Sequence, residues 1–187
     1  MVRHTFLAVP IPEEIQSKIH SYAEKVKPLL PLKKWTSLGD YHITLQFLGA
    51  TSEGKVDPLI EEMKKIEAPS FRLSINKTGY FGNPKIPRVF WLGINHSEKL
   101  NQLREQTKER SLTAGFEVEA RPYRPHITLG KRWDGDSKGV STESFTLPTE
   151  LDGCSWEVNE IILYEIHPGK DPMYAPYQRF KIGELAE

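Results

Sequence analysis

A four-residue pattern that occurs twice constrains this chain more than any other feature. His42-Ile43-Thr44-Leu45 in the first half of the sequence recurs as His126-Ile127-Thr128-Leu129 in the second half. Each copy alternates polar and apolar residues, which is typical of a half-buried β-strand, and each follows a segment with helical spacing. The recurrence indicates a duplicated unit, so we expect two related lobes that each contribute one such strand.

The polar side of the two strands carries the same pair of side chains. Because residues two apart on a strand point to the same face, His42 lies beside Thr44, and His126 lies beside Thr128. An imidazole holds or accepts a proton near neutral pH, and a threonine hydroxyl can hold an oxygen without adding charge. Two such pairs across a cleft would grip a phosphoryl group. One histidine would then activate water while the other protonates the leaving oxygen.

The recurrence is what favours this chemical interpretation over an ordinary structural one. A single histidine two residues before a threonine is common on strands and needs no functional explanation. Two identical copies at equivalent strand positions favour an acid–base pair. Duplicated core packing would produce the same repeat and is the alternative. On the other side of the two strands, Ile43, Leu45, Ile127 and Leu129 are expected to point into the core. Along the first strand, Ile43, Leu45 and Phe47 alternate with His42, Thr44 and Gln46.

The remaining sequence predicts a mixture of helices and strands. Helical spacing is found between Pro12 and Pro28, over 56–66 and over 97–114, and about eight or nine short segments have strand character. Several neighbouring strands have no helix between them, which favours antiparallel pairing. We therefore expect an α+β fold with two pseudo-symmetric lobes of mainly antiparallel sheet and outer helices around a central cleft. Residues 1–187 would form a single domain in which each lobe carries one His-x-Thr-x motif.

Composition argues against several classes of function. The 187 residues include 25 basic and 25 acidic side chains, so a long basic track for duplex nucleic acid is not expected. No apolar stretch approaches the roughly 20 residues of a membrane helix, and the apolar start is interrupted by Pro10. The lone cysteine, Cys154, can form neither an internal disulfide nor a cysteine metal cluster. We expect a cytoplasmic monomer without membrane attachment, metal or cofactor.

The paired motif and its surroundings resemble those of the two-histidine (2H) phosphoesterase superfamily. Within it, the similarity is to the bacterial and archaeal RNA 2′,3′-cyclic phosphodiesterases, long called 2′-5′ RNA ligases. Besides the two His-x-Thr-x copies, Trp35 stands shortly before the first motif, Phe47-Leu48-Gly49 follows it, and Tyr123-Arg124-Pro125 precedes the second. The resemblance covers essentially the whole chain.

This resemblance implies a reaction and a role for each histidine. His42 would be the proton donor and His126 the proton acceptor. An RNA end carrying a 2′,3′-cyclic phosphate would be opened to a 2′-phosphate without a metal. The resemblance also implies reversible 2′-5′ joining of RNA ends, in which a ribose hydroxyl takes the place of water. The expected partner is RNA with a cyclic phosphate end, or a related cyclic nucleotide.

Further residues are candidates for substrate binding. Thr44 and Thr128 would hold phosphoryl oxygens, and Trp35 would stack on a base or ribose, unless its role is packing. Tyr123 and Arg124 precede the second catalytic strand, where the arginine would stabilise negative charge.

One candidate departs from the family pattern. Relatives often have Ala-Arg after the second motif, whereas this chain has Gly130-Lys131. Lysine keeps the charge but lacks the bidentate guanidinium fork, so phosphate binding by Lys131 is expected to be weaker or differently angled. Simple solvation of Lys131 at the end of the strand is the alternative.

Two other functions stay open at this point. The first is a phosphodiesterase of the same superfamily that acts on a small cyclic nucleotide, which the zero net charge allows. The second is a non-catalytic binder of RNA ends that keeps the cleft. Intact histidines and threonines in both motifs argue against the second alternative.

Overall fold

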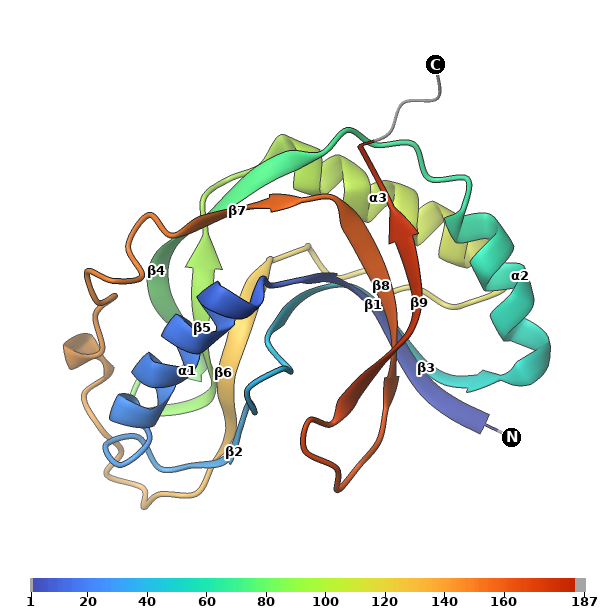
Figure 1. Ribbon diagram of the computed structural model, residues 1–187. Coiled ribbons are helices and arrows are strands. Elements are labelled where there is room, and N and C mark those ends of the chain that lie inside the picture. Colours follow the sequence, from blue (N-terminus) through green and yellow to red (C-terminus); the bar gives the residue numbers. More distant parts are fainter. Residues whose placement is uncertain (1, 184–187) are drawn as a thin grey trace.

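The structure describes residues 2–183, in which this computed structural model contains nine β-strands, three α-helices and one short 3-10 helix (Figure 1). The number of helices and strands agrees with the sequence-based prediction. The strands are β1 (Val2–Pro10), β2 (Leu32–Trp35), β3 (His42–Ser52), β4 (Phe71–Asn83), β5 (Ile86–Ile94), β6 (His126–Trp133), β7 (Ser155–Val158), β8 (Glu160–Ile166) and β9 (Tyr174–Lys181). The helices are α1 (Glu13–Val26), α2 (Glu53–Met63), α3 (Glu98–Thr113) and the 3-10 helix η1 (Thr142–Ser144).

The strands form one curled sheet in which neighbouring strands are antiparallel. Their order is β7-β4-β5-β6-β3-β1-β8-β9, with β2 pairing to β6. At the centre, β3 and β6 meet where Ile43 lies opposite Ile127. The prediction of a mainly antiparallel sheet is confirmed, and the two motif strands are direct neighbours.

The sheet has two halves of the same design. Outward from the centre, one half runs β3-β1-β8-β9 and the other runs β6-β5-β4-β7. Along the chain, β1, α1 and β3 in one half are matched by β5, α3 and β6 in the other. Helices α2 and α3 contact each other and β3, whereas α1 is tied to the segment after β6 by the Tyr22 hydroxyl, which donates to the Thr146 carbonyl. These are the two pseudo-symmetric lobes that the repeat predicts.

Local sequence accounts for the helices that cover the sheet. In α1, Ile15, Ile19 and Val26 recur at helical spacing and are buried. In α3, the Ser97 side chain caps the first turn by accepting a hydrogen bond from the Leu100 amide at 3.2 Å. Both helices contribute to the same apolar core, α1 through this stripe and α3 through Leu100 and Leu103.

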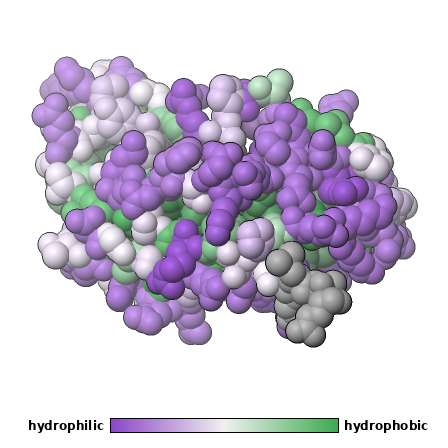
Figure 2. Space-filling model, turned by 90° about the horizontal axis from the view of Figure 1, so that it is seen from above, coloured by the Kyte–Doolittle hydropathy of each residue, from purple (hydrophilic) through white to green (hydrophobic). Residues whose placement is uncertain are grey.

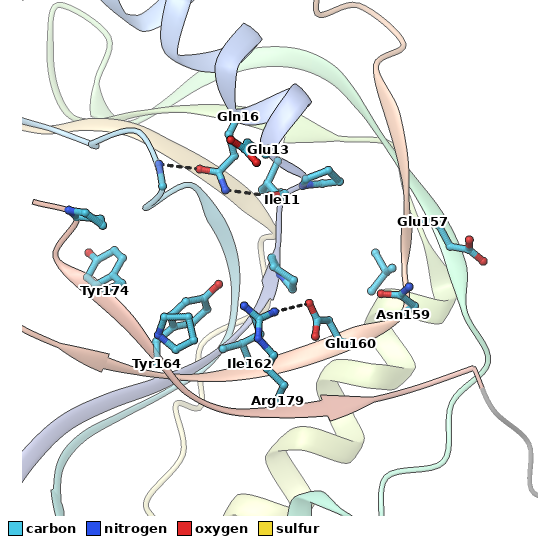
Figure 3. Close-up of a pocket in the computed structure, with 16 residues that line it drawn as sticks. Ile11, Glu13, Gln16, Glu157, Asn159, Glu160, Ile162, Tyr164, Tyr174 and Arg179 are labelled. Atoms are coloured by element: carbon cyan, nitrogen blue, oxygen red, sulfur yellow. Dashed lines mark hydrogen bonds and ion pairs between the residues drawn. The ribbon is translucent and has the colours of Figure 1, made fainter.

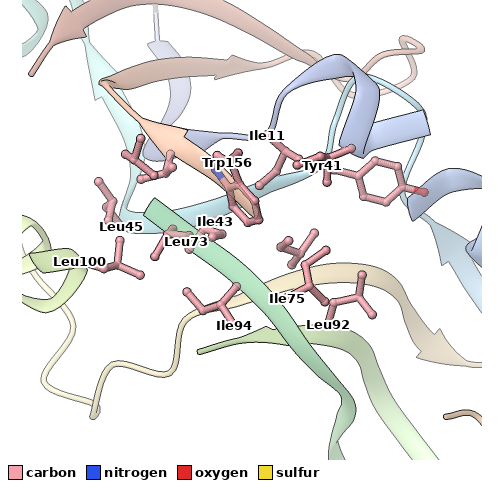
Figure 4. Packing of buried hydrophobic residues seen from close by; sticks show 14 of the residues in the cluster. Ile11, Tyr41, Ile43, Leu45, Leu73, Ile75, Leu92, Ile94, Leu100 and Trp156 are labelled. Carbon is pink, nitrogen blue, oxygen red and sulfur yellow. The ribbon is translucent and has the colours of Figure 1, made fainter. Parts of the chain in front are cut away.

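One apolar core joins the two lobes. Ile43 and Ile127 are completely buried within it, and Figure 4 shows Ile43 and Leu45 among buried side chains from other strands, such as Ile75 and Leu92. Burying a side chain of this size contributes about 1.5–3 kcal/mol. Because the apolar faces of both motif strands are anchored in this core, the opposite faces with the histidines and threonines are held in place.

A β-bulge in β3 changes which side chains face the cleft. Ala8 of β1 pairs with Thr44 and Leu7 pairs with Gln46, so Leu45 is an extra residue in β3. An extra residue shifts the alternation of faces from that point on. Gln46 is therefore buried, and Phe47 is 49% exposed. The alternation that the sequence shows for Ile43, Leu45 and Phe47 therefore does not continue past the bulge.

The second motif strand has a bulge at the equivalent position. Trp91 of β5 pairs with Thr128 and Phe90 pairs with Gly130, so Leu129 is the extra residue in β6. The bulge places Lys131, three residues after Thr128, on the side of the sheet that carries Thr128. Phe47 and Lys131 thus occupy equivalent places in the two lobes, one aromatic and one cationic.

Polar side chains dominate the face shown in Figure 2, where apolar residues are visible as smaller areas between them. Within residues 2–183, no helix combines the length and apolar character needed to span a membrane.

Candidate active site

The register of β3 and β6 brings the two motifs together. Because Ile43 lies opposite Ile127 in an antiparallel pair, His42 comes next to Thr128 and Thr44 comes next to His126. Directly opposed residues have Cβ atoms roughly 4.5–5.5 Å apart. Since the two isoleucines point into the core, these four polar side chains share the opposite face. A single face therefore carries both imidazoles and both hydroxyls.

The two histidines are oriented in the same way by the backbone. The Nδ1 atom of His42 is 2.7 Å from the carbonyl oxygen of Asp40, and the Nδ1 atom of His126 is 2.7 Å from the carbonyl oxygen of Arg124. A carbonyl oxygen only accepts, so each Nδ1 carries the proton. Nε2 is then the nitrogen that exchanges a proton with a bound molecule. In His42 this atom lies 3.1 Å from the Thr44 Oγ1.

Aromatic rings pack beside each imidazole. The Phe6 ring centroid is 4.8 Å from that of His42, and Tyr174 meets the same ring edge-on at 5.2 Å. Phe81 meets His126 edge-on at 4.9 Å, and Trp91 lies 6.2 Å from it. These rings restrict both imidazoles and shield them from water. The sequence analysis did not find them, since they come from β1, β4, β5 and β9 and belong to no motif.

The surroundings keep both imidazoles neutral in the free protein. Burial lowers the pKa of His42 from 6.5 to about 4, and the nearby charges of His126 and Lys131 act in the same direction. Burial also lowers the pKa of His126.

A buried aspartate holds the loop next to the first histidine. Asp40 is 4% exposed, and its carboxylate accepts hydrogen bonds from the amides of Met173 at 2.8 Å and Tyr174 at 3.0 Å. Its own carbonyl oxygen orients His42. Asp40 thereby connects the turn between β8 and β9 to β3 and His42. In the sequence, the only indication of this role is the position of Asp40 two residues before the first motif.

A cavity of about 640 Å³ opens along this face. Of the predicted site residues, His42, Thr44, Thr128, Trp35 and Lys131 line it. His126 is not in the lining and lies beyond Thr44 across the β3–β6 pair. The wall also contains residues that the sequence analysis did not assign to the site; they are Phe6, Lys33, Lys34, Thr36, Ser37, Asp40, Phe47, Ile166, Lys170, Met173 and Tyr174.

The two predicted residues that precede the second motif lie elsewhere. The Tyr123 hydroxyl donates to the Thr44 carbonyl at 3.0 Å, and its ring packs against the guanidinium of Arg104. This hydroxyl is already engaged by the protein, so its contact fits a role in positioning β3. Arg124 is exposed, and its carbonyl oxygen holds His126.

Trp35 and Lys131 lie where β2 pairs with β6. Trp35 is opposite Gly130, and Lys34 is opposite Lys131. A Cβ atom at Gly130 would come within 2.9 Å of Leu32 and 3.1 Å of Trp35, so glycine leaves room for the indole. Burial lowers the pKa of Lys131, and the charge of Lys34 lowers it further.

A second cavity of about 400 Å³ lies between the start of α1 and the β8–β9 pair (Figure 3). Glu13, Glu157 and Glu160 contribute acidic groups, and Arg179 is paired to Glu160 at 2.7 Å. Its acidic character makes it a poor site for phosphate. Within residues 2–183, no group of three or more histidine, cysteine, aspartate or glutamate side chains is arranged to hold a metal ion.

Comparison with known proteins identifies the family. The sequence model of the LigT like Phosphoesterase family matches the chain twice, over residues 9–91 and 92–174, with one His-x-Thr-x motif in each match. The chain belongs to this family. The family prediction made from the paired motif is therefore confirmed.

Two similar proteins share the name RNA 2′,3′-cyclic phosphodiesterase. The RNA 2′,3′-cyclic phosphodiesterase of Bacillus subtilis is 38% identical over 96% of this chain and 96% of its own length. The protein of the same name from Geobacillus stearothermophilus is 35% identical over 96% of this chain, which spans only 57% of that relative. Among solved structures, Escherichia coli LigT complexed with 3′-AMP has a TM-score of 0.82 at 25% identity, covering 98% of this chain and 100% of that one.

Proposed function

We propose that this chain hydrolyses the 2′,3′-cyclic phosphate at an RNA end to a 2′-phosphate. The observation that carries the proposal is the β3–β6 register, which sets two equally oriented imidazoles and two threonines on one face of a cleft. The names of the relatives support RNA ends as the substrate. The family resemblance supports His42 as proton donor and His126 as proton acceptor.

The proposed reaction is one in-line displacement at phosphorus. Nε2 of neutral His126 removes a proton from water as the water oxygen bonds to phosphorus. The bond between phosphorus and the 3′ oxygen breaks, and this oxygen takes a proton from His42. The products are a 2′-phosphate and a free 3′-hydroxyl. Ligation would be the same step with a ribose hydroxyl of another RNA end attacking phosphorus in place of water, while the 3′ oxygen again leaves with a proton from His42.

The state of His42 is the critical electrostatic requirement. Its Nδ1 already donates to the Asp40 carbonyl, so Nε2 can donate only when the ring is an imidazolium. In the free protein the pKa of His42 is about 4, which disfavours that form. A bound phosphodiester places a negative charge beside the ring and raises this pKa. Substrate binding thus favours the protonated form of His42, which is the form that can act as the acid.

Thr44, Thr128 and Lys131 complete the proposed phosphate site. The two hydroxyls flank the imidazoles and can donate to the non-bridging oxygens. Lys131 lies on the same face and supplies a positive charge that stabilises the developing negative charge on these oxygens. Trp35 and Phe47 line the same cavity and offer flat surfaces for a base.

The test is turnover of a short RNA that ends in a 2′,3′-cyclic phosphate, in the presence of excess chelator. We expect His42→Ala and His126→Ala each to lower kcat/KM by about 10²–10⁴-fold, the usual contribution of a general acid or base. His96→Ala, which removes an exposed histidine, is the matched control. The proposal fails if the wild-type protein does not open the ring, or if activity survives in both variants.

A second substrate separates the roles of the two histidines. Bis(p-nitrophenyl) phosphate has a leaving group that departs without a proton. On this substrate, His42→Ala should retain much more of the wild-type rate than His126→Ala. The reverse order would exchange the donor and acceptor assignments.

A small cyclic nucleotide is the alternative substrate. The complex of the Escherichia coli relative with 3′-AMP favours it, since that ligand is a mononucleotide. Rates on short RNA and on mononucleotide 2′,3′-cyclic phosphates distinguish the two. Equal or higher kcat/KM on the mononucleotide would favour the alternative, and tight binding without turnover would favour a non-catalytic binder.

A further inference from the structure

A cluster of lysines surrounds the mouth of the cleft. Lys33 and Lys34 come from β2, Lys131 from β6, and Lys170 from the turn between β8 and β9, and all four line the 640 Å³ cavity. Asp40, the acidic residue in this lining, directs its carboxylate to two backbone amides. The cleft mouth is therefore strongly positive although the whole chain has no net charge.

In the part of the chain that the structure describes, the lysines of this cluster have no counter-ions. Within residues 2–183, none of the four forms an ion pair, whereas lysines elsewhere do, such as Lys25 with Glu150 and Lys64 with Glu61. Lys34 and Lys131 are also directly opposite each other in the β2–β6 pair. Like charges in that position destabilise a sheet. Such a cost is expected where an anionic ligand offsets it.

The cluster extends beyond the phosphate site proposed above. Lys131 is three residues past Thr128, so the backbone of the Lys34–Lys131 pair lies about 7–10 Å from that threonine. Lys170 approaches from the other lobe, on the turn that follows β8. Figure 1 shows β2 and this turn at the same end of the molecule. A chain leaving the catalytic face through the mouth would pass between them.

The mouth also differs between the two lobes, and this asymmetry gives the substrate a direction. Phe47 and Lys131 occupy equivalent positions two residues past the bulges, so one side offers an aromatic ring and the other a charge. The lysine side continues into Lys33 and Lys34. This positively charged side suits a series of phosphates better than a base. Lysines act there as flexible point charges, which bind a phosphate backbone without reading its sequence.

We propose that Lys33, Lys34 and Lys170 bind the backbone phosphates of nucleotides upstream of the terminal cyclic phosphate. This inference rests on the proposed function and specifies its substrate as an RNA oligonucleotide. Mononucleotides lack these upstream phosphates and gain nothing from the lysines. The RNA chain runs from the catalytic histidines outward between β2 and the β8–β9 turn.

The experiment compares two substrates in the full chain: an RNA hexamer with a 2′,3′-cyclic phosphate end and a mononucleotide 2′,3′-cyclic phosphate. For the double variant Lys34→Ala with Lys170→Ala, we expect the ratio of the two kcat/KM values, hexamer over mononucleotide, to fall about tenfold, as expected for two lost phosphate contacts. Lys99→Ala removes the same kind of charge from an exposed position in α3 and is the control. This variant should keep the wild-type ratio.

Salt dependence provides an independent readout. Each phosphate contact on a single strand contributes a slope of about −0.7 to the logarithm of affinity against the logarithm of salt concentration. The slope of hexamer binding, measured by fluorescence anisotropy, should therefore become shallower by about 1.4 in the double variant. Thermal unfolding of each variant verifies that the fold is intact. Lys34→Arg should restore hexamer binding, because it restores the charge.

The outcomes separate this inference from the proposed function. An unchanged substrate ratio and an unchanged salt slope in the double variant would overturn the lysine track while leaving cyclic phosphate hydrolysis intact. If the wild-type protein binds the hexamer through Lys34 and Lys170 but opens neither substrate, the track stands and the proposed reaction fails. A higher wild-type kcat/KM on the mononucleotide than on the hexamer would also overturn the track.

Discussion

His42 and His126 share one hydrogen-bond arrangement, and it determines what each ring can do. Each Nδ1 donates to a backbone carbonyl two residues earlier, so all proton exchange occurs at Nε2. Their protonation states must differ for the proposed reaction: His42 charged and His126 neutral. Since burial lowers the pKa of both rings, the free protein near neutral pH holds the base in its active form and the acid in its inactive form.

The pH dependence of kcat/KM follows from these pKa values. The charged fraction of His42 falls about tenfold per pH unit above its pKa of about 4, and His126 is neutral above its own lowered pKa. We therefore expect kcat/KM to decrease as pH rises from 6.5 to 8.5. The decline in kcat should begin at higher pH, because bound phosphate raises the pKa of His42. Steady-state kinetics across this pH range measures the declines of kcat/KM and kcat. A kcat/KM that increases over this range would contradict the requirement for a charged His42.

Among the strands, close approach between β4 and β5 supports the second histidine. Gly79 of β4 lies opposite Trp91 of β5, and the Trp91 indole lies beside His126. A Cβ atom at Gly79 would overlap the indole ring. Glycine at this position therefore allows the indole to lie flat across the neighbouring strand and to restrict the imidazole.

Gly79→Ala tests this contact. We expect it to reduce the free energy of unfolding by about 1–3 kcal/mol, the usual cost of overpacking, and to lower kcat/KM by displacing Trp91 from His126. Urea denaturation and kinetics measure the two effects. Gly54→Ala in α2, where nothing lies within 4 Å of the added Cβ, is the control and should leave both values close to wild type. Equal behaviour of the two variants would contradict the role of Gly79.

For the whole molecule, the continuous core indicates that the two lobes form one unit. Buried residues of both lobes belong to a single cluster, with Ile43 and Ile127 at the junction. We propose that residues 1–187 are one domain and that the protein acts as a monomer. The support is that one chain contributes both histidines and both threonines to the site.

Mixing two inactive variants tests this proposal. If each site is built within one chain, equimolar His42→Ala and His126→Ala should stay as inactive as either alone after joint refolding. Recovery of about a quarter of the wild-type rate would indicate sites shared between two chains, because random pairing yields that fraction of intact sites. Thermal unfolding of the wild type should show one cooperative transition.

The sequence by itself determined the family and the class of fold, and it predicted the histidine pair. Each His-Ile-Thr-Leu copy encodes its own strand, because alternation of faces is a local property, and repetition of the copy encodes the pseudo-symmetric sheet. The absence of helices between many neighbouring strands was sufficient to predict antiparallel pairing. These features need no knowledge of which strands pair.

Only the tertiary structure decided the rest of the site, since it depends on pairing between distant strands. The bulges at Leu45 and Leu129 exist only relative to β1 and β5, and they turn Phe47 and Lys131 toward the cleft. The rings beside the histidines and the lysine on the β8–β9 turn come from segments far away in the chain. Local alternation cannot encode such neighbours, because register and curvature are set by the whole sheet.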